Sequence, residues 1–330
     1  MRYRELPRQP GVLQEAVDDE VLAALCRRML GAGTDLCASE PLAGGRFNTT
    51  YRLHFAGRSP LILRLAPPRR AHLFRHEAAA LRRECTIQPL LARTAAVFPR
   101  MVATDFSGTV VSRDCVLQDC LAGDLWAEVA PRLGAEDSAS LWRQFGTHVR
   151  RIHALRGSGF GFPSPAPLRR SYSVWLQELV AGMASDIGEL GLQVEGLDHF
   201  RALLGQGAAR IDRAGPPRLV HGDLWPRNVL VTQRDEGWLI SGILDAERAF
   251  WGDPAAEWIF SFLDIPDDFW CAYGQDLSAS AREGDALFRR CCYQARGALQ
   301  LILEAHRHGF DAGFAHDDFA ASLDHIAGLR

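Results

Sequence analysis

The sequence predicts an α+β protein with two unequal lobes, a small β-rich lobe that contains one helix and a larger, mainly helical lobe. The chain has 330 residues, which suffices for two domains or one bilobal domain. Short alternating apolar and polar runs fill residues 32–120, whereas apolar residues recur at helical spacing after Gly123. We therefore expect a first lobe over 1–117, a junction or hinge over 118–123 and a second lobe over 124–330.

The first lobe is expected to form a small mixed sheet with one helix, and an N-terminal helix precedes it. The N-terminal helix spans 18–31, where Leu22 and Leu25 fall on one face. The helix that belongs to the lobe spans 71–85 and carries Glu77 on its apolar face. Turns that contain glycine or proline separate the expected strands, which are 41–42, 49–55, 61–66, 97–104 and 115–120.

The second lobe is expected to be helical around one strand-rich island. Apolar residues recur at helical spacing over 138–154, 171–190, 198–213 and 287–306. The strands of the island are expected at 218–220, 229–232 and 238–244.

The composition excludes several kinds of chemistry. All 37 basic residues are arginine, so the chain has no Schiff-base lysine, no lysine for pyridoxal phosphate and no lysine-containing phosphate loop. The net charge of −3 argues against a nucleic-acid-binding protein. No apolar run approaches the roughly 18 residues of a membrane span. The eight cysteines form no CxxC pair, so we expect a protein of the reducing cytoplasm.

The strand-rich island also carries the most informative chemistry. Asp223 follows an apolar strand end in a His-Gly-Asp loop, and Asn228 opens the next strand. Asp245 ends the strand after that. If these two strands pair as a hairpin, Asn228 and Asp245 lie at the same end, close to Asp223. Two carboxylates and an amide oxygen around one point suit Mg²⁺.

Three ordered motif blocks resemble the aminoglycoside phosphotransferase and choline kinase-like superfamily. They are HGDLxxxNVL at 221–230, ILDxE at 243–247 and GDPxxE at 252–257. The resemblance implies the bilobal protein kinase-like fold and the transfer of phosphate to a hydroxyl group of a small molecule. The segment between Asp245 and Glu257 is too short for a regulated activation loop, which disfavours a protein kinase.

The resemblance also implies a nucleotide site for ATP in the first lobe. The lid over its phosphates would be the turn that contains Gly44, Gly45, Asn48 and Thr49. Arg64 stands where the family usually has lysine, on the strand that faces the α- and β-phosphates, and Glu77 is its expected ion-pair partner. The hinge that would receive the base contains Gln118 and Cys120.

The same resemblance assigns roles at the reaction centre. Asp223 would accept the proton of the attacking hydroxyl, and Asn228 and Asp245 would hold Mg²⁺. Arg64 would neutralise charge on the phosphates. A pseudokinase that only binds nucleotide is the alternative of another class, and the complete Asp223, Asn228 and Asp245 set argues against it.

The acceptor is the least determined part of the prediction. The candidate contacts are Trp225, Glu257, Trp258 and Asp264. Aromatic and acidic residues near the C-terminus slightly favour an aminoglycoside or another cationic antibiotic. A nucleoside, a macrolide, homoserine or a choline-like metabolite remain alternatives, and so does a biosynthetic role in place of resistance.

Overall fold

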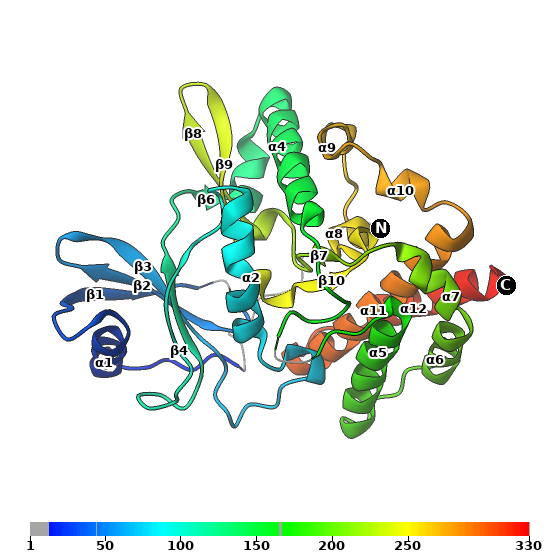
Figure 1. Ribbon diagram of the computed structural model, residues 1–330, viewed down its shortest axis with the longest axis horizontal. Helices are drawn as coiled ribbons and strands as arrows, with labels where there is room; N and C mark the ends of the chain where they lie inside the picture. Colours follow the sequence, from blue (N-terminus) through cyan, green and yellow to red (C-terminus); the bar gives the residue numbers. More distant parts are fainter. Residues whose placement is uncertain (1–12, 44, 165–166, 330) are drawn as a thin grey trace.

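The computed structural model describes residues 13–43, 45–164 and 167–329, and it has two parts (Figure 1). An antiparallel sheet lies on one side of the molecule, and a mainly helical part lies on the other. Helix α2 (Ala80–Thr94) stands between them. This arrangement confirms the predicted α+β fold with a small β-rich part followed by a larger helical part.

The five strands of the large sheet have the order β1-β2-β3-β5-β4. They are β1 (Leu36–Pro41), β2 (Thr49–Phe55), β3 (Arg58–Leu65), β4 (Met101–Asp105) and β5 (Cys115–Asp119). The predicted N-terminal helix is α1 (Asp19–Leu30), which Asp18 caps by accepting a hydrogen bond from the amide of Val21. Leu22 and Leu25 of α1 join the apolar cluster of the sheet.

The predicted helix over 71–85 is wrong in both of its boundaries. A single 3₁₀ turn covers Arg75–Glu77, and α2 begins only at Ala80, after Ala79 adopts a left-handed conformation with φ of 57°. The helix then continues through Pro89 to Thr94. Proline removes one backbone hydrogen bond, but Gln88 before it and Leu91 after it are buried, so packing keeps the helix intact.

Seven helices of the described chain make up most of the helical part. They are α3 (Trp126–Val129), α4 (Ala135–Ala154), α5 (Tyr172–Glu189), α6 (Leu197–Gln206), α7 (Ala208–Ile211), α11 (Gly284–His308) and α12 (Gly313–Gly328). The predicted single helix over 198–213 is divided into α6 and α7 at Gly207. A Cβ atom at Gly207 would overlap the ring of Phe288, so glycine allows α11 to approach this break.

Two small sheets hold the loops that carry the polar motifs. Strands β8 (Val229–Arg234) and β9 (Gly237–Ile243) pair as an antiparallel hairpin, and β6 (Asp124–Leu125) adds to its edge. Strand β7 (Arg218–Val220) pairs with β10 (Phe250–Gly252). Three short helices follow, α8 (Ile259–Phe262), α9 (Asp267–Tyr273) and α10 (Leu277–Ser280). None of the helices within the described ranges is long and apolar enough to cross a bilayer.

Gly146 on α4 provides a test of the packing between α4 and α9. A Cβ atom at this position would overlap the backbone carbonyl of Phe269 on α9. We therefore expect Gly146→Ala to destabilise the fold by about 1–3 kcal/mol, although alanine favours a helix. The measurement is the free energy of unfolding in urea.

Gly297 is the matched control because it also lies inside a long helix, α11, but its missing Cβ would meet no atom within 4 Å. Gly297→Ala should stabilise the protein by about 0.5–1 kcal/mol through helix propensity alone. Equal effects of the two substitutions would contradict the close approach of α4 and α9.

Candidate active site

The loop that carries Asp223 is held in place by a buried carboxylate. The backbone amides of His221 and Gly222 donate hydrogen bonds of 2.9 and 2.7 Å to the two carboxylate oxygens of Glu257, which has no exposed surface. Burial raises the pKa of Glu257, but the hydrogen bond and the charge of His153 outweigh burial, so the pKa lies below its usual value. Glu257 therefore remains a carboxylate that fixes the loop.

Glu257 was expected to contact the acceptor, and this expectation is wrong. Both of its oxygens are used by backbone amides, and His153 Nε2 lies 3.4 Å from one of them. The loop also requires Gly222, whose φ is 80° and whose Cβ would lie 2.6 Å from the carbonyl oxygen of Arg248.

Asn228 orients Asp223 through two hydrogen bonds. The Nδ2 atom of Asn228 donates to the backbone oxygen and to Oδ2 of Asp223, each at 2.9 Å. Burial raises the pKa of Asp223 to about 7, the charge of Arg248 lowers it, and the nearby charges of Asp245 and Glu304 raise it further. An aspartate with this pKa can both hold and release a proton near neutral pH.

The hairpin expected from the sequence is present, and it brings Asn228 and Asp245 to one end. Val229 pairs with Ile243, and the amide of Leu244 donates a 2.8 Å hydrogen bond to the carbonyl of Asn228. Asp245 follows in a left-handed conformation with φ of 67°.

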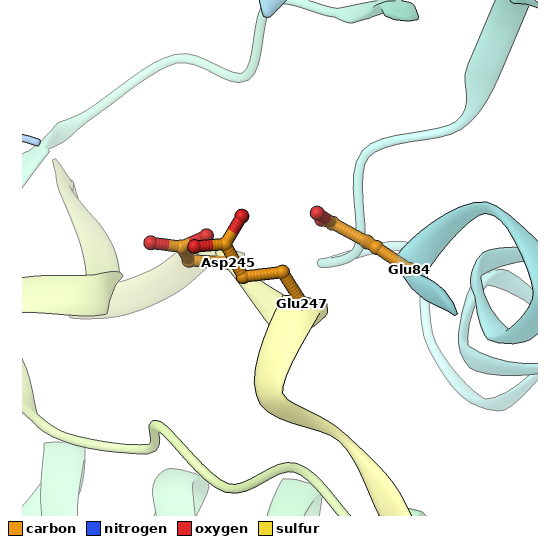
Figure 2. Close-up of side chains that lie close together, drawn as sticks. All are labelled: Glu84, Asp245 and Glu247. Atoms are coloured by element: carbon orange, nitrogen blue, oxygen red, sulfur yellow. The ribbon is translucent and has the colours of Figure 1, made fainter. Parts of the chain in front are cut away.

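Three carboxylates converge on Arg64, which lies on β3 and is itself buried. Figure 2 shows the carboxylates, with Glu84 coming from α2 and with Asp245 and Glu247 coming from the turn after β9. Arg64 Nη1 lies 2.5 Å from Glu84, and Nη2 lies 2.6 Å from Asp245 and 3.1 Å from Glu247. Burial, together with the charge of Asp245, raises the pKa of Glu247 to about 8, and burial also raises the pKa of Glu84.

Glu84 therefore takes the position that sequence reasoning gave to Glu77, and the predicted Arg64–Glu77 pair is wrong. Glu77 lies before α2, where it accepts a 2.8 Å hydrogen bond from the amide of Phe74 and pairs with Arg307. The sequence did contain a signal for Glu84, because it shares helical spacing with the buried Leu81 and Ile87.

The expected lid residues make contacts within the protein. Asn48 Nδ2 donates a 2.5 Å hydrogen bond to Glu247, so the turn before β2 is tied to the Arg64 cluster. Thr49 Oγ1 exchanges hydrogen bonds with the backbone of Glu15, and the carbonyl of Gly45 accepts one from Gln14. Gly44 lies outside the described residues.

The remaining predicted site residues lie at the edges of this arrangement. Gln118 is buried at the end of β5, its Oε1 has no hydrogen-bond partner within the described chain, and Cys120 follows in a half-buried position. Trp258 lies beneath two guanidinium groups, those of Arg248 and Arg296, at 5.8 and 5.6 Å from its ring centre. Trp225 is half-buried and Asp264 is exposed, and their roles stay predictions.

The residues near Asp223 fit a magnesium ion. Asn228 donates through its nitrogen to Asp223, so its amide oxygen is left for another partner. Asp245 uses one carboxylate oxygen for Arg64, and about a third of its side chain (34%) is exposed. Both groups are the hard oxygen donors that Mg²⁺ prefers. Glu84, Asp245 and Glu247 also lie within 4.8 Å of one another, but there the guanidinium of Arg64 supplies the positive charge.

The chain matches a family model for the phosphotransferase enzyme family over residues 39–292. The chain belongs to this family. Membership makes the protein a small-molecule kinase and confirms the resemblance found in its motifs. No curated protein matches the sequence.

Several solved structures of phosphotransferases share the fold at low sequence identity. A candidate aminoglycoside phosphotransferase from Ralstonia eutropha superposes with a TM-score of 0.60 at 15% identity, covering 95% of this chain and 99% of its own. The GDP and kanamycin complex of APH(2″)-IIIa gives 0.61 at 16% identity, with 94% and 99% covered. A candidate fructosamine-3-kinase from Thermobifida fusca gives 0.60 at 18%, with 93% and 98% covered. These phosphotransferases confirm the kinase-like bilobal fold.

Removal of Arg64 is expected to cost more stability than removal of one of the carboxylates around it. Arg64→Met leaves three clustered carboxylates without a cation and should cost about 3–5 kcal/mol in unfolding free energy. Glu84→Gln still leaves two carboxylates on Arg64, so it should change stability by about 1 kcal/mol or less. The measurement is urea denaturation of both variants.

A pH series and a surface control complete this test. The loss of unfolding free energy in Arg64→Met should become smaller on acidification to about pH 5, because protonated carboxyl groups no longer repel one another. Arg93→Met, at an exposed position on the same α2 helix, should leave stability unchanged within about 0.5 kcal/mol. A loss in Glu84→Gln as large as that in Arg64→Met would refute the shared-cation arrangement.

Proposed function

We propose that this small-molecule kinase transfers the γ-phosphate of ATP to a hydroxyl group, with Asp223 as the base and with Asn228 and Asp245 as the magnesium ligands. The observation that carries the proposal is the joint placement of these three residues, with Asp223 bonded to Asn228 and with Asp245 at the same end of the hairpin. A protein that served only as a scaffold has no physical need for this set, which argues against a pseudokinase.

Asp223 is suited to receive the proton of the acceptor. Its carboxylate is oriented by Asn228 at 2.9 Å, and its loop is fixed by Glu257, so it presents one defined geometry to a hydroxyl group. Its pKa of about 7 lies in the range where proton transfer is efficient. Phosphoryl transfer has a loose transition state, so positioning of the hydroxyl is the main contribution that Asp223 makes.

Arg64 and the carboxylates around it would form the part of the site that binds the phosphates of the nucleotide. When bound, Mg²⁺ neutralises charge on the phosphate oxygens. Glu84 holds Nη1 of the Arg64 guanidinium, and Nη2 contacts Asp245 and Glu247, so contact with the α- and β-phosphates requires Nη2 to exchange a carboxylate for a phosphate oxygen. Asp245 contacts Arg64 and also has an exposed edge, so it connects the cation of the protein with the metal site.

The nucleotide would lie between the sheet and the loops after β7 and β9. The lid is the turn before β2, which Asn48 already links to Glu247. Backbone groups between Gln118 and Cys120 at the end of β5 would receive the base. Similar structures carry GDP or ATP in their complexes, so both nucleotides are candidates.

The acceptor is a small molecule with a hydroxyl group, and an antibiotic or another natural product is the class that the similar structures suggest. Three of these structures are complexes with kanamycin, streptomycin and gentamicin. A metabolic acceptor is the second candidate, since a fructosamine kinase is equally similar in fold.

Asp223→Asn is the direct test of the proposed base. The substitution keeps the shape of the side chain and removes its proton affinity, so turnover should fall by about 10²–10⁴-fold. Nucleotide affinity should remain within a factor of about two. The measurement is coupled ADP release with Mg²⁺, ATP and a panel of hydroxyl compounds, beside calorimetric binding of the nucleotide.

Asp235→Asn is the control for this substitution because Asp235 is exposed in the turn between β8 and β9. Its turnover should equal that of the unmodified protein. If Asp223→Asn keeps more than about a tenth of the activity, Asp223 is not the base.

The magnesium ligands are tested by the metal requirement. Asn228→Ala and Asp245→Asn each remove one hard oxygen donor, so the Mg²⁺ concentration for half-maximal activity should rise by about tenfold or more. Asn228→Ala is the cleaner variant because Asn228 does not contact Arg64. An unchanged magnesium requirement in Asn228→Ala would overturn its assignment as a ligand.

A further inference from the structure

We propose that the acceptor carries an anionic group, a carboxylate or a phosphate ester, which binds in a pocket lined by Arg83, Arg248 and Arg296. This inference rests on the proposed phosphotransfer at Asp223 and names the class of its acceptor. It differs from the cationic acceptor that the acidic residues near the C-terminus favoured.

The pocket lies directly beside the catalytic loop. It has a volume of about 50 Å³ and is lined by Gly222 of the loop, Arg248 of the turn after β9, Arg83 of α2 and Arg296 of α11. One enclosed water needs roughly 10–15 Å³, so the volume exceeds what a single water fills. Gly222 directly precedes Asp223, and the charge of Arg248 acts on Asp223, so a molecule held here lies against the loop of the proposed base.

Three arginines line the pocket, Arg83, Arg248 and Arg296, against two carboxylates, Glu77 and Glu247. Glu77 pairs with Arg307, and Glu247 shares Arg64 with two further carboxylates. Glu304 lies beside the pocket and pairs with Arg248 at 2.9 Å. Among the described residues, Arg83 and Arg296 have no carboxylate within ion-pair distance, although both line the pocket. The pocket lining therefore has an excess of one guanidinium group over its carboxylates.

Arg83 shows this excess most clearly. The residue is only 3% exposed, and its Nη2 donates to the backbone carbonyl of His76 at 2.7 Å. Its guanidinium lies 3.9 Å from the ring centre of Phe162, and its Nε has no hydrogen-bond acceptor among the residues that the structure describes. Burial lowers the pKa of Arg83 to about 10, and nearby carboxylates only partly offset this. A buried charge without a counter-ion is costly, and a bound anion would remove that cost.

Arg296 and His76 complete the donor set. Arg296 Nη1 donates to Gln300 at 3.0 Å, and its guanidinium shares the ring of Trp258 with Arg248. Burial lowers the pKa of His76 to about 3, and the charges of Arg248, Arg83 and Arg296 contribute, so the imidazole is neutral. Its Nδ1 has no partner in the described chain. Guanidinium forks and a neutral imidazole together suit carboxylate or phosphate oxygens.

A cationic acceptor fits this pocket poorly. An ammonium group beside Arg83 and Arg296 would be repelled at short range in a site with little water to screen the charges. The acidic residue Asp264, which was expected to contact a cation, is exposed and is not part of the pocket lining. A hydroxy acid or a phosphorylated sugar offers a hydroxyl group to the proposed base and an anionic group to the arginines.

Anion binding is tested apart from turnover. The nucleotide site is first saturated with Mg²⁺ and a non-hydrolysable ATP analogue, and inorganic phosphate or acetate is then titrated while the melting temperature is recorded. The melting temperature should rise with phosphate for a phosphate-ester site and with acetate for a carboxylate site. Arg296→Gln and Arg83→Met should weaken this binding by about tenfold or more, and Arg93→Met should not.

Arg83→Met also separates a ligand-binding role from a structural one. Removal of an unpaired buried charge should leave the melting temperature without anion unchanged or higher. A large loss of stability in Arg83→Met would show that Arg83 is structural, and Arg296→Gln then carries the test of binding. If neither anion raises the melting temperature of the unmodified protein, the anionic pocket does not exist.

The acceptor class is tested with matched compounds. ADP release is compared for gluconate and sorbitol, for glucose 6-phosphate and glucose, and for kanamycin and choline. We expect kcat/KM to be at least about tenfold higher for gluconate than for sorbitol, or for glucose 6-phosphate than for glucose. Arg296→Gln should remove that preference. Turnover with kanamycin or choline alone would overturn the anionic acceptor and leave the kinase proposal standing. If phosphate binds but neither nucleotide binding nor ADP release is detected, the kinase proposal fails.

Discussion

The buried guanidinium of Arg64 is the interaction on which the rest of the site depends. It joins a strand of the sheet, β3, to Glu84 of α2 and to the turn after β9 that carries Asp245 and Glu247. Three carboxylates around one cation repel one another, so without Arg64 their ionised forms would be strongly disfavoured. Because the chain contains no lysine, the planar fork of arginine makes these contacts, with Nη1 on Glu84 and Nη2 on Asp245 and Glu247.

A second set of contacts fixes how α2 meets the helical part. The short segment before α2 is held by Arg307 of α11, which pairs with Glu77 and lies 3.7 Å from the ring centre of Phe74. The amide of Arg75 donates a 2.9 Å hydrogen bond to Asp186 of α5. Glu77 therefore links the two parts of the molecule, and Glu84, which lies on α2, pairs with Arg64.

Much of this architecture could be predicted from the sequence where local signals were strong. The strand over 49–55 has the predicted bounds, and the hairpin that places Asn228 beside Asp245 follows from apolar runs and a turn. The failures came where tertiary contacts decide. Glu77 and Glu84 both lie in helix-like sequence, and only packing against α5 and α11 shows which of them faces Arg64. Glu257 resembled a functional acid, but its role is to hold the backbone of residues 221–222.

The charge balance near the base could not be read from the sequence for a similar reason. The acidic residues near the C-terminus, such as Asp264, can be read from the sequence, whereas their distances from Asp223 cannot. Folding brings Arg83 of α2, Arg248 of the turn after β9 and Arg296 of α11 to one pocket, although 213 positions separate the first from the last (296 − 83). Three arginines but only two carboxylates line this pocket, and one of these, Glu77, is neutralised by Arg307 from outside the lining. The charge of the acceptor that a pocket favours depends on the charged groups that line it. The net charge of the chain, −3, gives no measure of that local charge.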